Sequence, residues 1–188
     1  MDYQRLLQNC LKAKPAAQKE LYDHFAPVML GVCYRYTKSR TDAEDVLQEG
    51  FIKVFQSLHQ YKNAGELGGW IRKIMVRTAI NYLKKNTRYK SELIFTDEQH
   101  HPLSNDTPDV WLHAKALAEL IRQLPTGYQA IFNLHAVEGY THVEIGDMLG
   151  IQEGTSRSQY SRARSQLMCW IAAQNREPKT DLYAGTKL

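Results

Sequence analysis

The residues with the most evident binding chemistry lie in the segment Gly139–Trp170, which reads GYTHVEIGDMLGIQEGTSRSQYSRARSQLMCW. At about 100° per residue, its second half forms a helix whose one side is small or apolar: Ser156, Tyr160, Ala163, Leu167 and Ile171. The other side and its N-terminal edge carry six candidate DNA contacts: Thr155, Arg157, Ser158, Gln159, Ser161 and Arg162. Small hydroxyl groups between arginines allow close approach to phosphates, and Arg and Gln can read base edges.

A helix-turn-helix is the element that would position these residues. Thr141 and Glu144 form a T-x-x-E capping box that opens a first helix. Gly150 ends it as a C′ glycine, and the second helix begins near Glu153–Thr155. A polar helix face by itself fits a solvated bundle helix equally well. The cap, the glycine turn and the R-x-R pair together favour DNA binding through the second helix.

A second candidate nucleic-acid surface follows the glycine-containing loop at residues 60–69. The helix expected from Trp70 to about Lys85 aligns one aromatic, one amide and three basic residues in a narrow sector: Trp70, Lys73, Arg77, Asn81 and Lys84. Cations that follow phosphates beside a stacking aromatic suit single-stranded nucleic acid. The alternative is a solvated basic face with Trp70 packed in the core. Arg72 lies among the apolar positions of this helix, and the pattern does not explain it.

An acidic helix precedes that loop. Thr41 and Glu44 predict a second capping box, and the helix should run to about Leu58 with a buried apolar stripe. Its other side carries Asp42, Asp45, Gln48, Glu49, Ile52 and Lys53. Acids in a first turn complement the helix dipole, so a structural role explains them. Ile52 is an apolar residue ringed by charges, which fits either a protein contact or an ordinary exposed isoleucine.

The rest of the chain also predicts helices and no strand. They are expected at residues 3–13, 16–36 (with Pro27 kinking or dividing it), 108–124 and 127–137. The sequence therefore indicates an all-α fold of two small helical domains joined by a flexible linker, the second a helix-turn-helix domain. The expected ranges are 1–90, a linker at 91–107, 108–175, and a frayed tail at 176–188.

The composition of the chain limits the classes of function that it can have. The net charge is +4, and two basic blocks flank an acidic stretch at Thr96–Leu112, which suggests two nucleic-acid contacts. No apolar run approaches the ~20 residues of a membrane span, and the N-terminus lacks a secretory signal pattern, so a cytoplasmic protein is expected. Cys10, Cys33 and Cys169 are too few and too scattered to suggest a disulfide framework or zinc site.

Taken in order, these elements resemble the bacterial RNA polymerase sigma factors of the extracytoplasmic-function (ECF) group, which keep only the second and fourth conserved regions of the sigma-70 family. The resemblance covers roughly residues 10–172. It rests on DAEDVLQEGFIKVF, on GGWIRKIMVRTAINYLKK and on LPTGYQAIFNLHAVEGYTHVEIGDMLGIQEGTSRSQYSRAR. These segments look like the clamp-docking part, the part that melts and holds the −10 element, and the region that reads the −35 element.

The resemblance implies a role for each candidate residue. A surface for the polymerase clamp would comprise Asp42, Glu44, Asp45, Gln48, Glu49 and Ile52. Trp70, Lys73, Arg77, Asn81 and Lys84 would face single-stranded −10 DNA, and Asn63 would lie at a pocket for a flipped base. Thr155, Arg157, Ser158, Gln159, Ser161 and Arg162 would lie in the duplex −35 major groove. An anti-sigma factor would be a further partner, and no cofactor, metal or catalytic residue is implied.

This chain departs from the family pattern in the recognition helix. Ser156 and Gln159 stand where a β-branched and a basic residue are frequent, which leaves the promoter sequence open. Two other classes of protein are alternatives to a sigma factor. An autonomous dimeric helix-turn-helix repressor would need neither the acidic nor the basic N-terminal helix. An enzyme would need a nucleophile, metal or phosphate-binding motif, and the sequence carries none.

Overall fold

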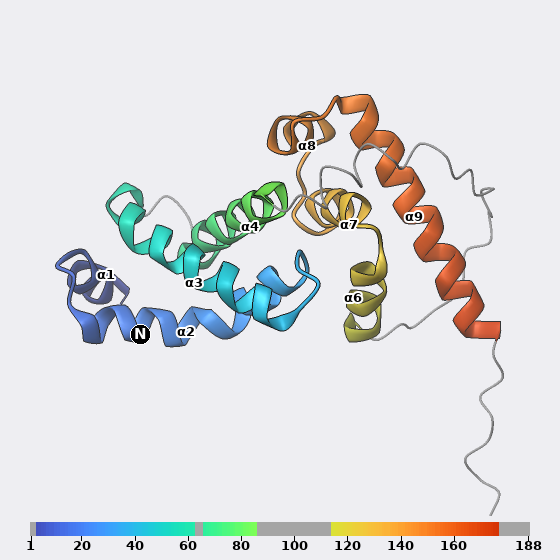
Figure 1. Ribbon diagram of the computed structural model, residues 1–188. Helices are drawn as coiled ribbons and strands as arrows, with labels where there is room; N and C mark the ends of the chain where they lie inside the picture. Colours follow the sequence, from blue (N-terminus) through green and yellow to red (C-terminus); the bar gives the residue numbers. More distant parts are fainter. Residues whose placement is uncertain (1–2, 63–65, 86–113, 177–188) are drawn as a thin grey trace, which may run out of the picture.

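The computed structural model describes residues 3–62, 66–85 and 114–176, and every regular element within them is helical. The N-terminal half contains α1 (Tyr3–Leu11), α2 (Pro15–Tyr34), α3 (Arg40–Ser57), a 3₁₀ turn (Leu58–Gln60) and α4 (Leu67–Lys85). The C-terminal half contains α6 (Ala114–Gln123), α7 (Thr126–Phe132), the π-helical turn η2 (Asn133–Val137), α8 (His142–Leu149) and α9 (Glu153–Arg176). The predicted all-α fold class is confirmed (Figure 1).

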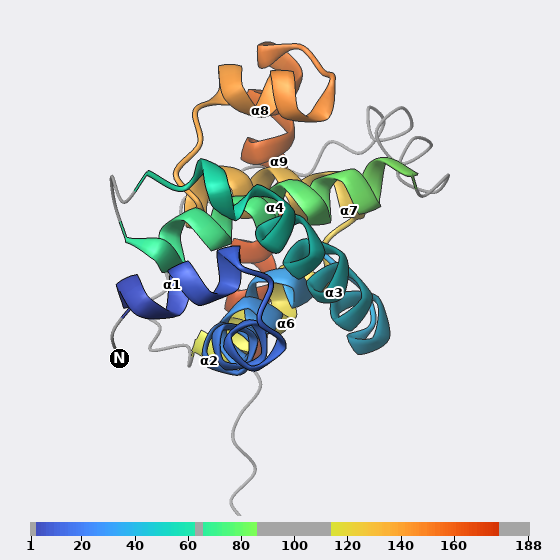
Figure 2. The same cartoon turned by 90° about the vertical axis from the view of Figure 1, so that its left-hand side faces the viewer.

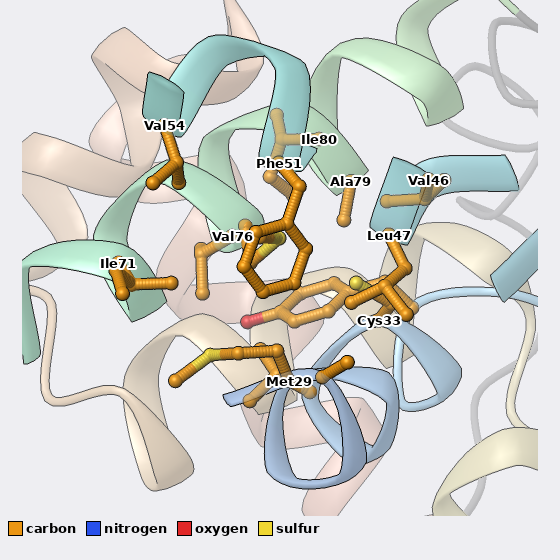
Figure 3. Packing of buried hydrophobic residues seen from close by; sticks show 14 of the residues in the cluster. Met29, Cys33, Val46, Leu47, Phe51, Val54, Ile71, Val76, Ala79 and Ile80 are labelled. Carbon is orange, nitrogen blue, oxygen red and sulfur yellow. The ribbon is translucent and has the colours of Figure 1, made fainter. Parts of the chain in front are cut away.

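The N-terminal half is organised around the apolar faces of α2, α3 and α4. The expected stripe of α3 is buried at Leu47, Phe51, Val54 and Leu58. It packs against Met29 and Cys33 of α2 and against α4, as Figure 3 shows for Phe51, Val76 and Ile80. Burial of such side chains, at about 25 cal/mol per Å² of apolar surface, is what stabilises helices of this length.

The C-terminal half has its own cluster, in which α9 lies along α6 and α7 (Figure 1). The cluster joins Leu120, Ile121, Leu124, Tyr128, Ala163 and Leu167. The predicted division of α9 into two sides is confirmed at Ser156, Ala163 and Leu167, all of which are buried. Trp170 and Ile171 extend this contact toward the end of the helix.

One local prediction was wrong. Helix α3 begins at Arg40 rather than after Thr41, because the N-cap is Ser39, whose Oγ accepts from the Asp42 backbone N–H at 3.0 Å. Of the two outcomes expected at Pro27, a kink or a division, the division does not occur, because α2 continues as one helix from Pro15 to Tyr34. Ala26 and Met29 beside the proline are buried, so packing holds the helix across the missing backbone hydrogen bond.

Some predicted features lie outside the described residues. These are Asn63, the linker expected at 91–107, the first six residues of the helix expected at 108–124, and the tail beyond Arg176. No helix in the described parts of the chain has the length and apolar character that crossing a lipid bilayer requires.

The helix-turn-helix turn is built as its sequence predicts. Thr141 and Glu144 form the reciprocal capping box, and Gly150 ends α8 in the left-handed region at φ 73°. The N–H groups of Gly150 and Ile151 both bond the Gly146 carbonyl, at 2.8 and 3.0 Å. Gly146 itself faces the turn, because a Cβ there would lie 2.8 Å from the Ile151 carbonyl oxygen.

Gly146→Ala should therefore destabilise the helix-turn-helix by about 1–3 kcal/mol, since a backbone atom cannot move aside as a flexible side chain can. Denaturant unfolding would measure the change. Gly154→Ala in α9 is the matched control, because nothing lies within 4 Å of its Cβ position. That change should be neutral or stabilising, by up to about 1 kcal/mol. Equal stabilities of the two variants would contradict the close-approach argument.

Candidate nucleic-acid interface

The N-terminal turns of α9 present most of the predicted contacts to solvent. Arg157, Ser158 and Ser161 are exposed, and Thr155 and Arg162 are half-buried. Arg157 is held by Glu153 one turn earlier, with Nε 2.9 Å from the carboxylate. Exposed pairs at this spacing are worth only a few tenths of a kcal/mol, so a phosphate can replace Glu153 as the partner.

Gln159 is placed differently from its predicted role. Its side chain is 4% exposed, so it faces the interior of the domain rather than the polar side of α9. The Oε1 atom is buried and has no hydrogen-bond partner among the described residues. The side chain cannot reach a base edge from this position. Gln159 is therefore a buried residue of the domain interior and not one of the exposed groups that α9 offers to DNA.

An aromatic stack that sequence reasoning missed holds the recognition helix in place. The rings of His135 and His142 lie 4.2 Å apart at 24°, and His135 also meets Tyr160 edge-on at 4.6 Å. His142 Nδ1 lies 3.0 Å from the Oγ of buried Ser156, and His135 Nδ1 lies 2.8 Å from the Tyr140 carbonyl. The stack thus ties η2 and α8 to α9.

Burial lowers the pKa of His142, and the charges of His135 and Arg157 lower it further, against a smaller opposite effect of Glu153. The stack therefore favours a neutral ring at this position, because two protonated imidazoles in contact would repel each other. The spacing of 135, 142 and 160 matches no single helix face, so periodicity could not have revealed the cluster.

The predicted line on α4 occurs in the structure. Lys73, Arg77 and Asn81 are exposed, and Lys84 and Trp70 are half-buried. Trp70 packs on Tyr61 with ring centroids 5.4 Å apart, so part of its ring belongs to the fold and part remains at the surface. Steps of three and four residues place all five side chains on one side of the helix. This arrangement can follow a phosphate backbone and offer one stacking surface.

The predicted acidic surface of α3 separates into two groups. Asp42 belongs to the helix cap and bonds Ser39 and Tyr82, and those hydrogen bonds lower its pKa. Glu44 pairs with Arg40, and Glu49 with Lys53, whose Nζ also reaches Thr78 of α4. The remaining three residues, Asp45, Gln48 and Ile52, are exposed along one stripe, with Ile52 56% exposed.

A groove of about 520 Å³ lies between α2 and α3 beside this stripe. Its walls are apolar with acidic and amide groups at the rim: Tyr22, Asp23, Ala26, Pro27, Leu30, Glu44, Leu47 and Gln48. Val28 on α2 is 64% exposed. An apolar groove with an acidic rim is suited to a protein partner that presents apolar and basic side chains.

Comparison with known proteins finds two family models on this chain. Sigma-70 region 2 matches residues 21–89, and Sigma-70 region 4 matches residues 114–167. The first match contains α3 and α4, and the second contains the helix-turn-helix.

Individual relatives are similar over most of the chain. The ECF RNA polymerase sigma factor SigE of Mycolicibacterium smegmatis is 32% identical over 162 residues, which cover 84% of this chain and 63% of SigE. The chain therefore spans less than two thirds of that relative's length. The RNA polymerase sigma factor SigV of Bacillus subtilis is 30% identical over 132 residues, covering 70% of this chain and 77% of SigV.

A solved structure shares the fold. The sigma factor RpoE of Bartonella quintana, in complex with the anti-sigma factor NepR, matches with a TM-score of 0.50 and 17% identity. The match covers 82% of this chain and 96% of that chain.

The histidine stack generates a pH prediction. The folded-state pKa of His142 lies below its ordinary value of 6.5, so between the two values the unfolded chain binds more protons. Stability should therefore fall as the pH drops through 6.5 toward the lowered folded pKa. His142→Asn, which keeps a polar group near the Nδ1 position, should remove that part of the pH dependence. Thermal unfolding at several pH values, with exposed His59→Asn as control, checks this; parallel curves for all three proteins would contradict it.

Proposed function

We propose that this chain, which belongs to the ECF group of the sigma-70 family, is a transcription initiation factor that binds core RNA polymerase and directs it to specific promoters. One observation carries the proposal. Two separate helices, α4 and α9, present basic, exposed faces in the two regions that the family models match. A promoter-specificity subunit needs both faces, whereas a repressor needs only a recognition helix.

The polymerase-binding surface is assigned to α3 and its neighbouring groove. Asp45, Gln48 and Ile52 are exposed there, and the groove adds apolar surface. Glu44 and Glu49 contribute charge to the same face, although both also pair within the helix. Asp42 acts as part of the helix cap, so its contribution to the partner is indirect.

Promoter DNA is assigned to two surfaces. The α4 residues Lys73, Arg77, Asn81 and Lys84, with the exposed part of Trp70, hold the separated −10 strand through phosphates and stacking. Asn63 remains a prediction from the sequence. On α9, the −35 contacts are Thr155, Arg157, Ser158, Ser161 and Arg162, which enter the major groove as a helix-turn-helix does.

This role requires no catalysis by the chain itself, and it places the protein in the cytoplasm with the polymerase. An anti-sigma factor is a further partner in the proposal, supported by the complex of the Bartonella relative with its own anti-sigma factor.

Run-off transcription with bacterial core polymerase and genomic promoter fragments tests the proposal. The wild-type protein should produce new start sites, and Asp45→Arg should abolish them. The same change should weaken polymerase binding by about tenfold or more, which is the order of magnitude expected when a charge pair across an interface is lost. Asp45 is exposed and makes no ion pair within the described residues, so circular dichroism should stay unchanged. The control is Glu20→Arg, which makes the same change of charge at an exposed residue of α2. Strong footprints on duplex DNA by the free protein, with no new start sites, would favour a repressor instead.

Arg157→Ala should weaken binding of the assembled polymerase to −35 duplex by about 1–3 kcal/mol if the guanidinium reads a base. If it contacts a phosphate, the loss should be uniform across sequences and the salt slope should fall by about one. Filter binding at several salt concentrations separates these cases. The control is Lys19→Ala, which removes one positive charge from an exposed residue of α2 and should leave DNA binding unchanged. An Arg157→Ala protein that binds −35 DNA like the wild type would refute the assignment.

A further inference from the structure

The first two turns of α9 are anchored in the domain by polar side chains. The buried residues of these turns are Ser156, which is 0% exposed, and Gln159, which is 4% exposed. The buried aliphatic side chains of α9, Ala163 and Leu167, come later, after the predicted DNA contacts. The position of the DNA-facing turns therefore depends on the groups that hold the buried polar residues.

His142 is the hydrogen-bond partner of Ser156. Its Nδ1 lies 3.0 Å from the Ser156 Oγ. His142 is the first residue of α8, which packs against α9, and Figure 2 shows α8 beside the start of that helix. This bond is thus a directed contact between the recognition helix and the helix that precedes it.

The ring of His142 also stacks on His135 of η2, with 4.2 Å between the ring centroids. The Nδ1 of His135 lies 2.8 Å from the Tyr140 carbonyl oxygen, which can only accept, so this nitrogen carries a proton and donates. The same ring meets Tyr160 of α9 edge-on at 4.6 Å. The two imidazoles therefore connect η2, α8 and α9.

The end of η2 is fixed by a buried carboxylate. Glu138 directly follows η2, and its side chain is 5% exposed. One oxygen accepts from Arg72 Nε at 2.6 Å, and the other accepts from Arg72 Nη2 and Arg35 Nη2, each at 3.0 Å. This contact explains why an arginine stands among the apolar positions of α4. Because η2 is held in this way, repulsion between the stacked rings would be relieved by movement of α8 and the start of α9.

A proton on His142 would meet two positive neighbours and one acid that is already paired. Burial lowers the pKa of His142 most, the charges of His135 and Arg157 lower it further, and Glu153 raises it. Glu153 forms an ion pair with Arg157 one turn later on α9. Like charges in contact disfavour the protonated form, so the closed stack favours neutral rings.

The other ionisable groups beside the stack do not offset such a proton. Tyr160 of α9 lies with its ring centroid 5.7 Å from that of His142 and presents a neutral aromatic ring. Glu144, two residues later on α8, is bound to the backbone N–H and the hydroxyl of Thr141. Acid therefore opposes the contacts that hold the first turns of α9.

We propose that His142 is a positioning residue for the −35 contacts of α9, and that protonation of its stack with His135 loosens the first turns of α9 and weakens binding to duplex DNA. The DNA step rests on the proposed function; the loosening of α9 in acid does not. Because only the closed arrangement presents the contacts correctly, affinity falls in proportion to the fraction of chains that keep it.

Hydrogen exchange on the full-length free protein tests the loosening. From about pH 7.5 to about pH 5.5, the amides of residues 157–160 should lose protection about threefold or more, after correction for intrinsic exchange rates. His142→Asn keeps a polar atom near the Nδ1 position but cannot take up a proton, so its protection should stay constant. Equal losses in the wild type and in His142→Asn would overturn the role of the histidine.

Two further variants separate the stack from general effects of acid. His135→Asn removes the other ring and should also abolish the pH dependence of exchange at residues 157–160. His59→Asn changes an exposed histidine of the 3₁₀ turn and should behave as the wild type does. Circular dichroism should show equal helix content in all variants. A pH dependence that His135→Asn leaves intact would overturn the stack as its cause.

Binding of the assembled polymerase to a duplex with the −35 element, taken from a promoter found by run-off transcription, tests the DNA step. The affinity of the wild type relative to His142→Asn should fall about threefold from about pH 7.5 to about pH 5.5. The ratio cancels titration of the polymerase itself. A constant ratio would overturn positioning. A ratio that rises in acid would overturn it too, because a protonated ring that contacts a phosphate gains affinity.

The two experiments separate this inference from the proposed function. Hydrogen exchange uses neither polymerase nor DNA. Loss of protection in acid, in a chain that produces no new start sites, would refute the proposed function and the DNA step while supporting the acid-sensitive hold on α9. New start sites together with pH-independent protection would support the proposed function and overturn the inference.

Discussion

The burial of one carboxylate constrains the arrangement of the whole chain. An ionised carboxylate withdrawn from water costs several kcal/mol unless charged donors replace its hydration. Glu138 obtains three such bonds from Arg35 and Arg72, and it obtains them only while the end of α2, the side of α4 and the turn after η2 stay together. The position of the helix-turn-helix relative to α4 follows from this requirement. The burial of Ile145 and Leu149 against the N-terminal core then adds apolar stabilisation to the same arrangement.

Both nucleic-acid surfaces combine a rigid support with side chains left for a partner. On α9, the buried Ser156 and the histidine stack hold the helix, while Arg157 and Ser158 stay at the surface. On α4, the apolar face is fully packed and the basic residues project from the other side. Because the helices are already in place, the free-energy cost of binding a partner comes mainly from removing water from polar groups and from ordering side chains.

The acidic helix shows how charge can serve structure and recognition on one face. Asp42 and Glu49 are engaged within the fold, and their hydrogen bonds lower their pKa values. Asp45 and Ile52 have no such engagement among the described contacts and lie beside an apolar groove. The pattern of acids in a first turn could not separate these groups, since the helix dipole favours all of them.

Local features were determined by the sequence alone. The helical class of the described elements, the stripe on α3, the two sides of α9, the Thr141 cap and the Gly150 turn all follow from periodicity and from residues a few positions apart. The π-helical turn that replaces the last part of the helix expected at 127–137 was not predicted. One cap was misplaced, at Thr41 instead of Ser39, because neighbouring hydroxyls compete for the same helix end.

Tertiary structure alone decided the features that join distant residues. The role of Arg72, the burial of Gln159, the close approach at Gly146 and the stack of His142 depend on which elements face one another. Periodicity reports which side of a helix is apolar but not what packs against it. A buried ion pair between positions 72 and 138 leaves no local pattern, because its energy arises only when folding brings the two side chains together out of water.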